Sequence, residues 1–491
     1  MFTLIHEVDS AISPEVLAGR LRNQSGLVVL RTAVFDHPDS RCSLVTADPF
    51  MTFRSTGDRC ELIEAETNRR TEWRGNPWQV LDELFRRFES PTGADSPFPL
   101  GGCFGYWGFD LKEFVEPSAA RRKLNDLRIP DCQVGFFDSL VVFDHRLNKT
   151  LIVSTGLGPD GSRSGDRARE RMAMWWRLLE SDHDEPELPK ERHDGRVDSP
   201  ARSGANVTSN MSRDHYLAAV AAALRYIRAG DIYQVNLAHR LSTAWDRSAW
   251  ELFERLTAVS PAPFSAYLDG GDFQIVSSSP ELFLKMSGSH ITTRPIKGTR
   301  PRAREAEADA RLNYELVTSP KETAELVMIT DLLRNDLGKI CEFGSVRVSE
   351  LFRVERYSHV QHLVSTIEGQ LRRGTTHLAA LASSFPGGSI TGAPKIRAMQ
   401  IIDQLESVSR GPYTGALGYA GFNGESQFSI LIRAAICQNQ HAHFHVGAGI
   451  VADSIPEAEY AETLAKAGGF FEALNWEGKS RPNAVSANAP N

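Results

Sequence analysis

Hydrophobic and polar residues recur along this chain with two different periods, which predict its strands and its helices. Within residues 25–55, the apolar runs GLVVLRTAVF and CSLVTADPF flank the turn-forming segment DHPDSR, a pattern that predicts strand, turn, strand. Residues 134–153 predict a hairpin that turns at residues 145–148, and the glycine-rich and aromatic-rich segment that begins at Gly101 predicts a close-packed strand. The first part of the chain is therefore predicted to be rich in β-structure.

Helical spacing of apolar residues predicts amphipathic helices over residues 78–88, 168–180 and 212–227. A strand is predicted to follow over residues 232–241. Between the second and third helices the chain is crowded with Asp, Glu, Pro, Ser and Gly, a composition typical of a linker. The predicted organisation is a β-rich region over residues 1–180, a polar linker over 181–211, a second unit over 212–475 and a disordered tail over 476–491.

Composition narrows the class of protein. A chain of 491 residues has room for two or three domains at roughly 100–200 residues each. The net charge is −7 and there is no basic block, so nucleic acid is not expected as a partner. No apolar run approaches the ~20 residues of a membrane-spanning helix, and the first residues lack the features of a signal peptide. The six cysteines show no metal-binding spacing, so a cytoplasmic protein with reduced thiols is expected.

Lysine 297 is the first candidate for chemistry. It follows a β-branched run, residues 290–293, and Pro295, so the sequence predicts a strand that ends in a turn with Lys297 where the strand stops. Partial desolvation of this amine would favour its neutral form, which is the nucleophilic one. By itself the pattern is also typical of an exposed loop lysine.

Two predicted helices each carry two glutamates three residues apart. The pairs are Glu322 with Glu325 and Glu459 with Glu462, and Lys466 follows four residues after Glu462. Each pair lies on one face of its helix. If the two faces met across a cleft they would suit Mg²⁺, which is commonly held by one or two carboxylates, by waters and by oxygens of an anionic ligand. The alternative is two solvated helix faces with a surface ion pair between Glu462 and Lys466.

A glycine-rich turn, FPGGSITGAPK over residues 385–395, precedes a predicted helix that continues to residue 405. It is not a nucleotide phosphate loop, because Ala393 and Pro394 stand where that motif requires Lys and Ser or Thr. His359 and His362 are three residues apart, a spacing that does not put both on one face of a strand, so a zinc pair is not expected.

Taken together, these residues carry a resemblance that spacing alone could not establish. Residues 212–475 resemble the chorismate-binding enzymes, a family that includes anthranilate, aminodeoxychorismate, isochorismate and salicylate synthases. The matching segments, in chain order, are GDIYQVNL from Gly230, SSSPELF from Ser277, PIKGTRPR from Pro295, AELVMITDLLRNDLGK from Ala324, YSHVQHLVS from Tyr357, FPGGSITGAPK from Phe385, GPYTGALGY from Gly411, ILIRAA from Ile430 and VGAGIVADSIPEAEYAETLAKA from Val446. The N-terminal region shows a weaker similarity, in FDHPDSRCSLVTADP and GCFGYWGFDL.

The resemblance implies an α+β fold in which two large, mostly antiparallel β-sheets pack together with helices on the outside. Lys297 favours the aminodeoxychorismate synthases, because anthranilate synthases have alanine at the matching position. In that branch the lysine attacks C2 of chorismate while the C4 hydroxyl leaves, and Glu281 matches the general acid. Gln234 matches a position that is a lysine base in the water-adding isochorismate and salicylate synthases, so it disfavours them.

The remaining site residues are also implied by the resemblance. Glu325 and Glu462 match Mg²⁺ ligands, and Glu322 and Glu459 match residues that hold metal-bound waters. Thr299 and His362 match the lining of the pocket near the substrate ring. The positions that match the binding of the substrate carboxylates are Tyr413, Arg433, Gly447, Ala448, Gly449 and Lys466, a task that suits a guanidinium and backbone N–H groups.

The chain shows no cysteine nucleophile of the glutaminase type, so the expected partners are chorismate, ammonia and a separate glutaminase subunit. No fused lyase is expected after residue 474. Some family members hold tryptophan in a pocket that matches Thr32, Ser40, Pro263, Phe264 and Ser265. Thr32 and Asp39 depart from that pattern, which leaves tryptophan binding open. The expected activity is that of an aminodeoxychorismate synthase component I in folate biosynthesis; the alternatives are an anthranilate synthase component I and, more remotely, a non-catalytic chorismate-binding subunit.

Overall fold

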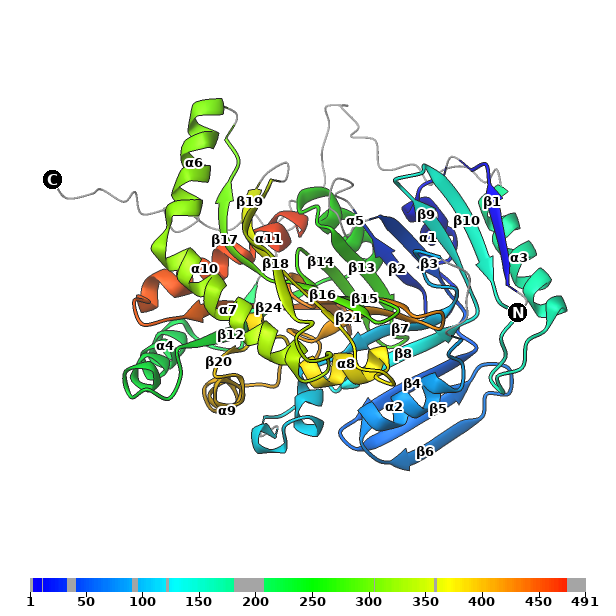
Figure 1. Ribbon diagram of the computed structural model, residues 1–491, viewed down its shortest axis with the longest axis horizontal. Coiled ribbons are helices and arrows are strands. Elements are labelled where there is room, and N and C mark those ends of the chain that lie inside the picture. Colours follow the sequence, from blue (N-terminus) through cyan, green and yellow to red (C-terminus); the bar gives the residue numbers. More distant parts are fainter. Residues whose placement is uncertain are drawn as a thin grey trace.

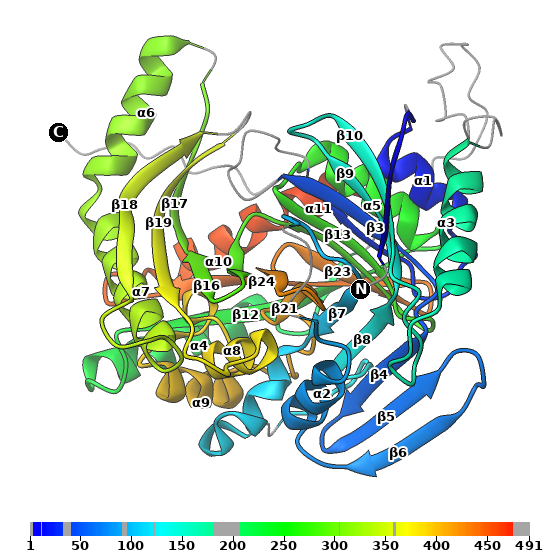
Figure 2. The same cartoon turned by 45° about the vertical axis from the view of Figure 1, so that its right-hand side comes forward.

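Two antiparallel sheets of 12 strands each dominate the computed structural model of the chain, with helices on their outer faces (Figure 1, Figure 2). The structure describes residues 3–10, 12–32, 41–90, 96–120, 123–180, 207–303, 305–356 and 360–474. Every strand pairing that it shows in these sheets is antiparallel, for example β12 with β24 and β17 with β19. The predicted fold class, α+β with two large antiparallel sheets, is confirmed.

The first sheet contains strands from both ends of the chain. Its order is β1 (Leu4–Val8), β10 (Lys149–Ser154), β9 (Ser139–Asp144), β3 (Cys42–Thr46), β2 (Val28–Arg31), β13 (Phe264–Asp269), β14 (Gln274–Ser279), β23 (Ala434–Gln438), β24 (His441–Ile450), β12 (Gln234–Ala244) and β11 (Thr208–Ser209), with β20 (Gly392–Ala393) paired to β12.

The second sheet is built in the same way. Its order is β17 (Ile296–Pro301), β19 (Val360–Gln370), β16 (His290–Arg294), β15 (Leu282–Ser287), β22 (Glu425–Ile430), β21 (Ala416–Gly421), β7 (Gly102–Trp107), β8 (Cys132–Phe137), β4 (Met51–Thr56), β5 (Arg59–Glu64) and β6 (Arg70–Arg74), with β18 (Arg347–Arg356) paired to β19. The predicted β-rich region thus supplies strands to both sheets.

Helices cover the outer faces. The α-helices are α1 (Pro14–Arg20), α2 (Pro77–Arg86), α3 (Gly165–Glu180), α4 (Arg213–Arg228), α5 (Ala249–Val259), α6 (Ala306–Thr318), α7 (Pro320–Gly338), α8 (His377–Ser384), α9 (Lys395–Leu405), α10 (Pro456–Lys466) and α11 (Gly468–Ala473), and short 3₁₀ turns are η1 (Phe109–Phe114), η2 (Pro117–Ala119) and η3 (Gly388–Ile390). The helices predicted over residues 78–88, 168–180 and 212–227 correspond to α2, α3 and α4. None of the described helices combines the length and the apolar character needed to cross a membrane.

The core lies in layers that explain the apolar patterns. Between the sheets, Phe104 and Leu417 of the second sheet join Val142 and Ile275 of the first in one buried cluster. A second cluster packs the outer face of the second sheet against α2, α7 and α8, and a third packs the outer face of the first sheet against α3, α5 and α11. Strand β7 is buried along its whole length, because both of its faces are covered. This is why its sequence is apolar and does not alternate.

One strand prediction was wrong in its pairing. Residues 134–153 were expected to form a single hairpin, and β9 and β10 do pair across residues 145–148. Strand β8, however, pairs with β4 and β7 in the second sheet. The chain crosses between the sheets at Asp138, which separates β8 from β9. Both strands are apolar on both faces, so the sequence pattern carries no sign of the crossing. The predicted tail and residues 181–206 of the predicted linker lie outside the described residues.

Candidate functional site

Two crossings of the chain between the sheets meet at one place and hold two of the predicted site residues. The first crossing leads from β14 to β15 through Glu281, and the second leads from β22 to β23 through Arg433. The crossings are hydrogen-bonded to each other: the Ile430 N–H donates to the Glu281 carbonyl at 3.1 Å, and the Ser278 N–H donates to the Arg433 carbonyl at 3.0 Å. Residues from both sheets therefore converge at this junction.

The Glu281 carboxyl is enclosed, with only 6% of the residue exposed. Burial raises the pKa of this carboxyl, and this effect outweighs the opposing effects of a hydrogen bond from Ser389 and of the positive charge of Lys297. The Ser279 hydroxyl accepts the Glu281 N–H at 3.3 Å and donates to the Ile430 carbonyl at 2.6 Å, which fixes the backbone of the crossing. A buried carboxylic acid that holds its proton is suited to general-acid work.

Lys297 lies on a strand and not in a turn, which corrects the sequence prediction. Pro295 separates β16 from β17, and both strands pair with β19. A break in the pairing register between Lys297 and Thr299 contains Gly298, whose φ is +65°. The half-buried Lys297 donates from Nζ to the Ser389 carbonyl at 3.2 Å. The edge strand thus places the amine beside Glu281.

Thr299 and His362, both predicted to line the pocket, face each other on β17 and β19. The Thr299 hydroxyl lies 2.9 Å from His362 Nδ1. Burial and the nearby Arg433 lower the pKa of His362 to about 4, so the imidazole is neutral at neutral pH. Burial also lowers the pKa of the Arg433 guanidinium, which remains a cation at neutral pH.

The backbone that is predicted to bind the substrate carboxylates lies on strand β24, next to β12. Gly447, Ala448 and Gly449 pair with β12. A Cβ at Gly447 would lie 2.9 Å from the Tyr413 hydroxyl, and a Cβ at Gly449 would lie 2.5 Å from Gln234 Nε2. Only glycine therefore lets these side chains approach the backbone. Tyr413 also stacks on His445 at 5.0 Å, and burial raises its pKa to about 12.

The predicted metal carboxylates lie on α7 and α10 and repel each other. Burial raises the pKa of Glu325, and the negative charges of Glu322 and Glu462 raise it further. The positive charges of Lys297 and Lys321 lower it, but by less. This mutual repulsion is the feature that a divalent cation would relieve.

Each of the other glutamates has a protein partner. Glu322 meets Arg300 at 3.3 Å, and the Ser454 hydroxyl donates to Glu459 at 2.6 Å. Glu462 meets Lys466 at 2.8 Å. Within the described ranges, no three acidic, histidine or cysteine side chains converge as a closed metal site. An Mg²⁺ site here would have to be open, with one carboxylate from each helix and with water and substrate oxygens completing the coordination.

Lys466 contacts both Glu462 of α10 and strand β24. Its Nζ donates to the Gly447 carbonyl at 2.9 Å while it pairs with Glu462. The ion pair expected for two solvated helix faces is thus present, but it lies against the strand that carries the predicted carboxylate-binding residues. Lys466 therefore links helix α10 to strand β24.

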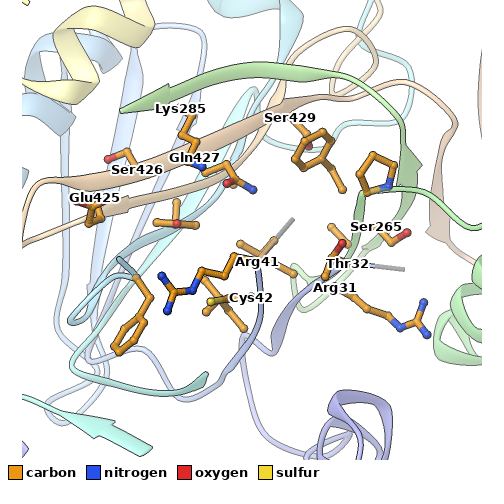
Figure 3. A pocket seen from close by; sticks show the side chains of 18 of the residues that line it. Arg31, Thr32, Arg41, Cys42, Ser265, Lys285, Glu425, Ser426, Gln427 and Ser429 are labelled. Atoms are coloured by element: carbon orange, nitrogen blue, oxygen red, sulfur yellow. The ribbon is translucent and has the colours of Figure 1, made fainter. Parts of the chain in front are cut away.

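The residues predicted for a tryptophan pocket line a separate cavity of about 300 Å³ between the sheets (Figure 3). Thr32, Pro263, Phe264 and Ser265 all line it, whereas Ser40 lies outside the described residues. Figure 3 also shows Arg31 and Arg41 at this cavity. The structure thus brings four of the five predicted residues to one cavity.

Sequence reasoning missed three residues of the site. Ser389 contacts both Lys297 and Glu281. Asn236 places its side-chain oxygen 2.7 Å from where a Cβ at Gly447 would lie. The buried Arg410 donates to the carbonyls of Ile390 and Asn236 at 3.2 and 2.8 Å. The glycine-rich sequence around Ser389 indicated an unusual backbone there, but it did not indicate that the serine reaches Lys297 and Glu281.

Comparisons with known proteins identify relatives over nearly the whole chain. A family model described as chorismate binding enzyme matches residues 33–472. The chain is 35% identical over 473 residues to an anthranilate synthase component 1 from Acetivibrio thermocellus, covering 96% of this chain and 94% of that protein. It is 37% identical over 478 residues to an aminodeoxychorismate synthase component 1 from Escherichia coli, covering 96% and 98%. The crystal structure of anthranilate synthase component I from Streptococcus pneumoniae superposes with a TM-score of 0.75 at 28% identity, covering 90% of this chain and 94% of that one.

Proposed function

Because this chain belongs to the chorismate-binding enzyme family, we propose that it is an aminodeoxychorismate synthase component 1, which converts chorismate and ammonia into 4-amino-4-deoxychorismate. The observation that carries the proposal is the Lys297 amine, held beside the buried Glu281 carboxyl with Ser389 in contact with both. An amine next to a carboxyl whose raised pKa lets it keep its proton to higher pH is the pair that a covalent displacement of a hydroxyl requires.

The first step forms a bond between Lys297 and the substrate. The Lys297 amine attacks C2 of chorismate through its lone pair, the ring double bonds shift, and the C4–oxygen bond breaks. Glu281 gives its proton to the departing oxygen, which leaves as water. The lysine nitrogen, now bonded to C2, passes a proton to the Glu281 carboxylate, which restores the acid. A hydroxide ion is a poor leaving group, so this step depends on a carboxyl that holds its proton.

In the second step, ammonia attacks C4, the double bonds shift back, and the bond between C2 and the lysine nitrogen breaks. The nitrogen added at C4 loses a proton, and the lysine nitrogen takes one up and is regenerated as an amine. The net reaction consumes chorismate and ammonia and releases 4-amino-4-deoxychorismate and water. Dividing one allylic substitution into two displacements lowers the barrier of each.

The other residues of the site would bind and orient the substrate. Arg433, Tyr413, Lys466 and the backbone around Ala448 would hold the substrate carboxylates, since these groups donate hydrogen bonds or carry positive charge. Glu325 and Glu462 would hold Mg²⁺, and a bound Mg²⁺ supplies electrostatic stabilisation of an anionic substrate. Ammonia would come from a separate glutaminase subunit, in keeping with relatives that are named as component 1.

The product tests the proposal. Incubating the purified chain with chorismate, Mg²⁺ and ammonium should give 4-amino-4-deoxychorismate, identified by mass and by its conversion to para-aminobenzoate with an added lyase. Anthranilate, which is aromatic and fluorescent, would instead assign the chain to the anthranilate synthases, which are also among its relatives. Absence of any turnover would favour a non-catalytic chorismate-binding subunit.

Replacing Glu462 by glutamine should weaken Mg²⁺ binding. Glu462 is the carboxylate of α10 that acts on Glu325 of α7, and a neutral amide is a poorer ligand for a hard cation. We expect the Mg²⁺ concentration for half-maximal activity to rise by about tenfold or more, the scale of losses on altering a metal site. Calorimetric titration with Mg²⁺ would give the same shift without turnover. Glu457→Gln, which changes another exposed glutamate of the same helix, is the control. An unchanged titration for Glu462→Gln would remove this residue from the metal site.

A further inference from the structure

The glycine-rich turn, residues 387–391, is a rigid element of the site. The Thr391 hydroxyl donates to the Gly387 carbonyl at 3.0 Å, and the Arg410 guanidinium donates to the Ile390 carbonyl at 3.2 Å. Arg410 is itself buried and paired with Glu406 at 2.6 Å. The turn is therefore held by one hydrogen bond within it and by a second from the buried Arg410, which is itself ion-paired.

The two glycines explain how closely the turn approaches its neighbours. A Cβ at Gly388 would lie 2.5 Å from Cδ2 of Leu332 on α7, and a Cβ at Gly387 would lie 2.8 Å from Cδ1 of Ile430. A side chain at either position would meet these side-chain ends, so that Leu332, Ile430 or the turn itself would have to move. The two glycines thus let the turn that carries Ser389 pack closely against α7 and Ile430.

Ser389 meets the two residues with different groups. Its backbone carbonyl accepts from Lys297 Nζ at 3.2 Å. Its side chain hydrogen-bonds to the Glu281 carboxyl. Ser389 is 7% exposed, so water competes little for either contact. Ser389 therefore interacts with both the proposed nucleophile, Lys297, and the proposed acid, Glu281.

We propose that Ser389 is a positioning residue that couples the two catalytic groups, with its carbonyl orienting the Lys297 amine and its hydroxyl orienting the Glu281 carboxyl. The inference rests on the proposed function, because it assigns these two residues their roles in the covalent step. An amine that donates one N–H to a fixed carbonyl has its lone pair aimed in a defined direction. A carboxyl held by a hydroxyl presents its proton toward the leaving oxygen in the same way.

The hydroxyl also sets the pH range in which the acid works. The bond from Ser389 favours ionised Glu281 and so lowers its pKa, as does the charge of Lys297, while burial raises it. Lys297 is the charged group that acts on this carboxyl among the described residues. Removing the hydroxyl should therefore raise the pKa of Glu281, and the carboxyl should keep its proton to higher pH.

The test compares Ser389→Ala and Ser389→Thr with the unmodified chain. Chorismate consumption with Mg²⁺ and ammonium is followed across pH, and covalent adduct formation without ammonia is followed by rapid-quench mass spectrometry. For Ser389→Ala we expect the alkaline fall of kcat/KM to move up by about one pH unit, the scale of one hydrogen bond to a carboxylate. The rate of adduct formation should fall roughly tenfold. Ser389→Thr, which keeps the hydroxyl, should restore both.

A matched control is available five residues earlier. Ser384 is as buried as Ser389, and its hydroxyl has no hydrogen-bond partner in the described part of the chain. Ser384→Ala should leave the pH profile unchanged. An unmoved alkaline limb in Ser389→Ala, or a Thr variant that behaves like the Ala variant, would overturn the inference. Because chorismate consumption is measured whichever amine product forms, a wrong product would refute the proposed function without deciding the role of Ser389.

Discussion

Lys297→Ala should abolish the covalent adduct and lower turnover of chorismate by roughly 10³-fold or more, the range seen when an enzymatic nucleophile is removed. Slow direct addition of ammonia should remain, because the acid and the binding residues are untouched. Intact-protein mass spectrometry after incubation with chorismate and Mg²⁺, but without ammonia, measures the adduct directly. Peptide mapping would place it on the peptide that contains Lys297.

A variant that keeps the positive charge distinguishes the nucleophilic role of Lys297 from its electrostatic effect. Lys297 lowers the pKa values of Glu281 and Glu325, so its positive charge matters to the site apart from any bond it forms. Lys297→Arg keeps the charge but has no free amine at neutral pH. It should form no adduct and stay as slow as the alanine variant. Lys149→Ala, which removes an exposed ion pair with Glu7, is the control for loss of a lysine. Full turnover by Lys297→Arg would show that only the charge is needed.

Glu281→Gln should slow both adduct formation and overall turnover by roughly 10²–10⁴-fold, the usual contribution of a positioned general acid. The amide keeps the size and the hydrogen-bonding capacity of the carboxyl but cannot give a proton to the departing hydroxyl. Rapid-quench mass spectrometry measures the first step, and the rate of chorismate consumption measures the whole reaction. A normal rate of adduct formation would show that another group protonates the leaving oxygen.

The pH dependence of kcat/KM provides a second test of Glu281→Gln. Burial raises the pKa of Glu281 above the ordinary range of a carboxyl. The protonated form therefore persists to higher pH, and kcat/KM should fall as pH rises through this pKa. Glu281→Gln should lose that alkaline fall. Glu89→Gln serves as the control, because burial also raises the pKa of Glu89, which lies beyond the end of α2. An alkaline fall that survives in Glu281→Gln belongs to another group.

The sequence determined the local features of this site because they depend on neighbours along the chain. The capping of α7 follows from Ser319, whose hydroxyl accepts the Glu322 N–H. The 3.6-residue period of that helix then places Glu325 on the same face as Glu322. The helices α2, α3 and α4 follow equally from their own apolar spacing. The family resemblance added the residue roles, since it compares whole segments and not single patterns.

Only the tertiary structure decided how the segments meet. Apolar periodicity records which faces of a strand are buried, but it does not record which distant strand pairs with it. The expected turn at Lys297 is therefore strand β17, in which Lys297 pairs with Leu363, 66 positions away. For the same reason β8 and β9 belong to different sheets although their sequences look alike. Ser389 reaches Lys297 across 92 positions, through a turn whose glycines allow the approach. Contacts of this kind arise from the closing of two sheets on each other, a long-range event that no local pattern encodes.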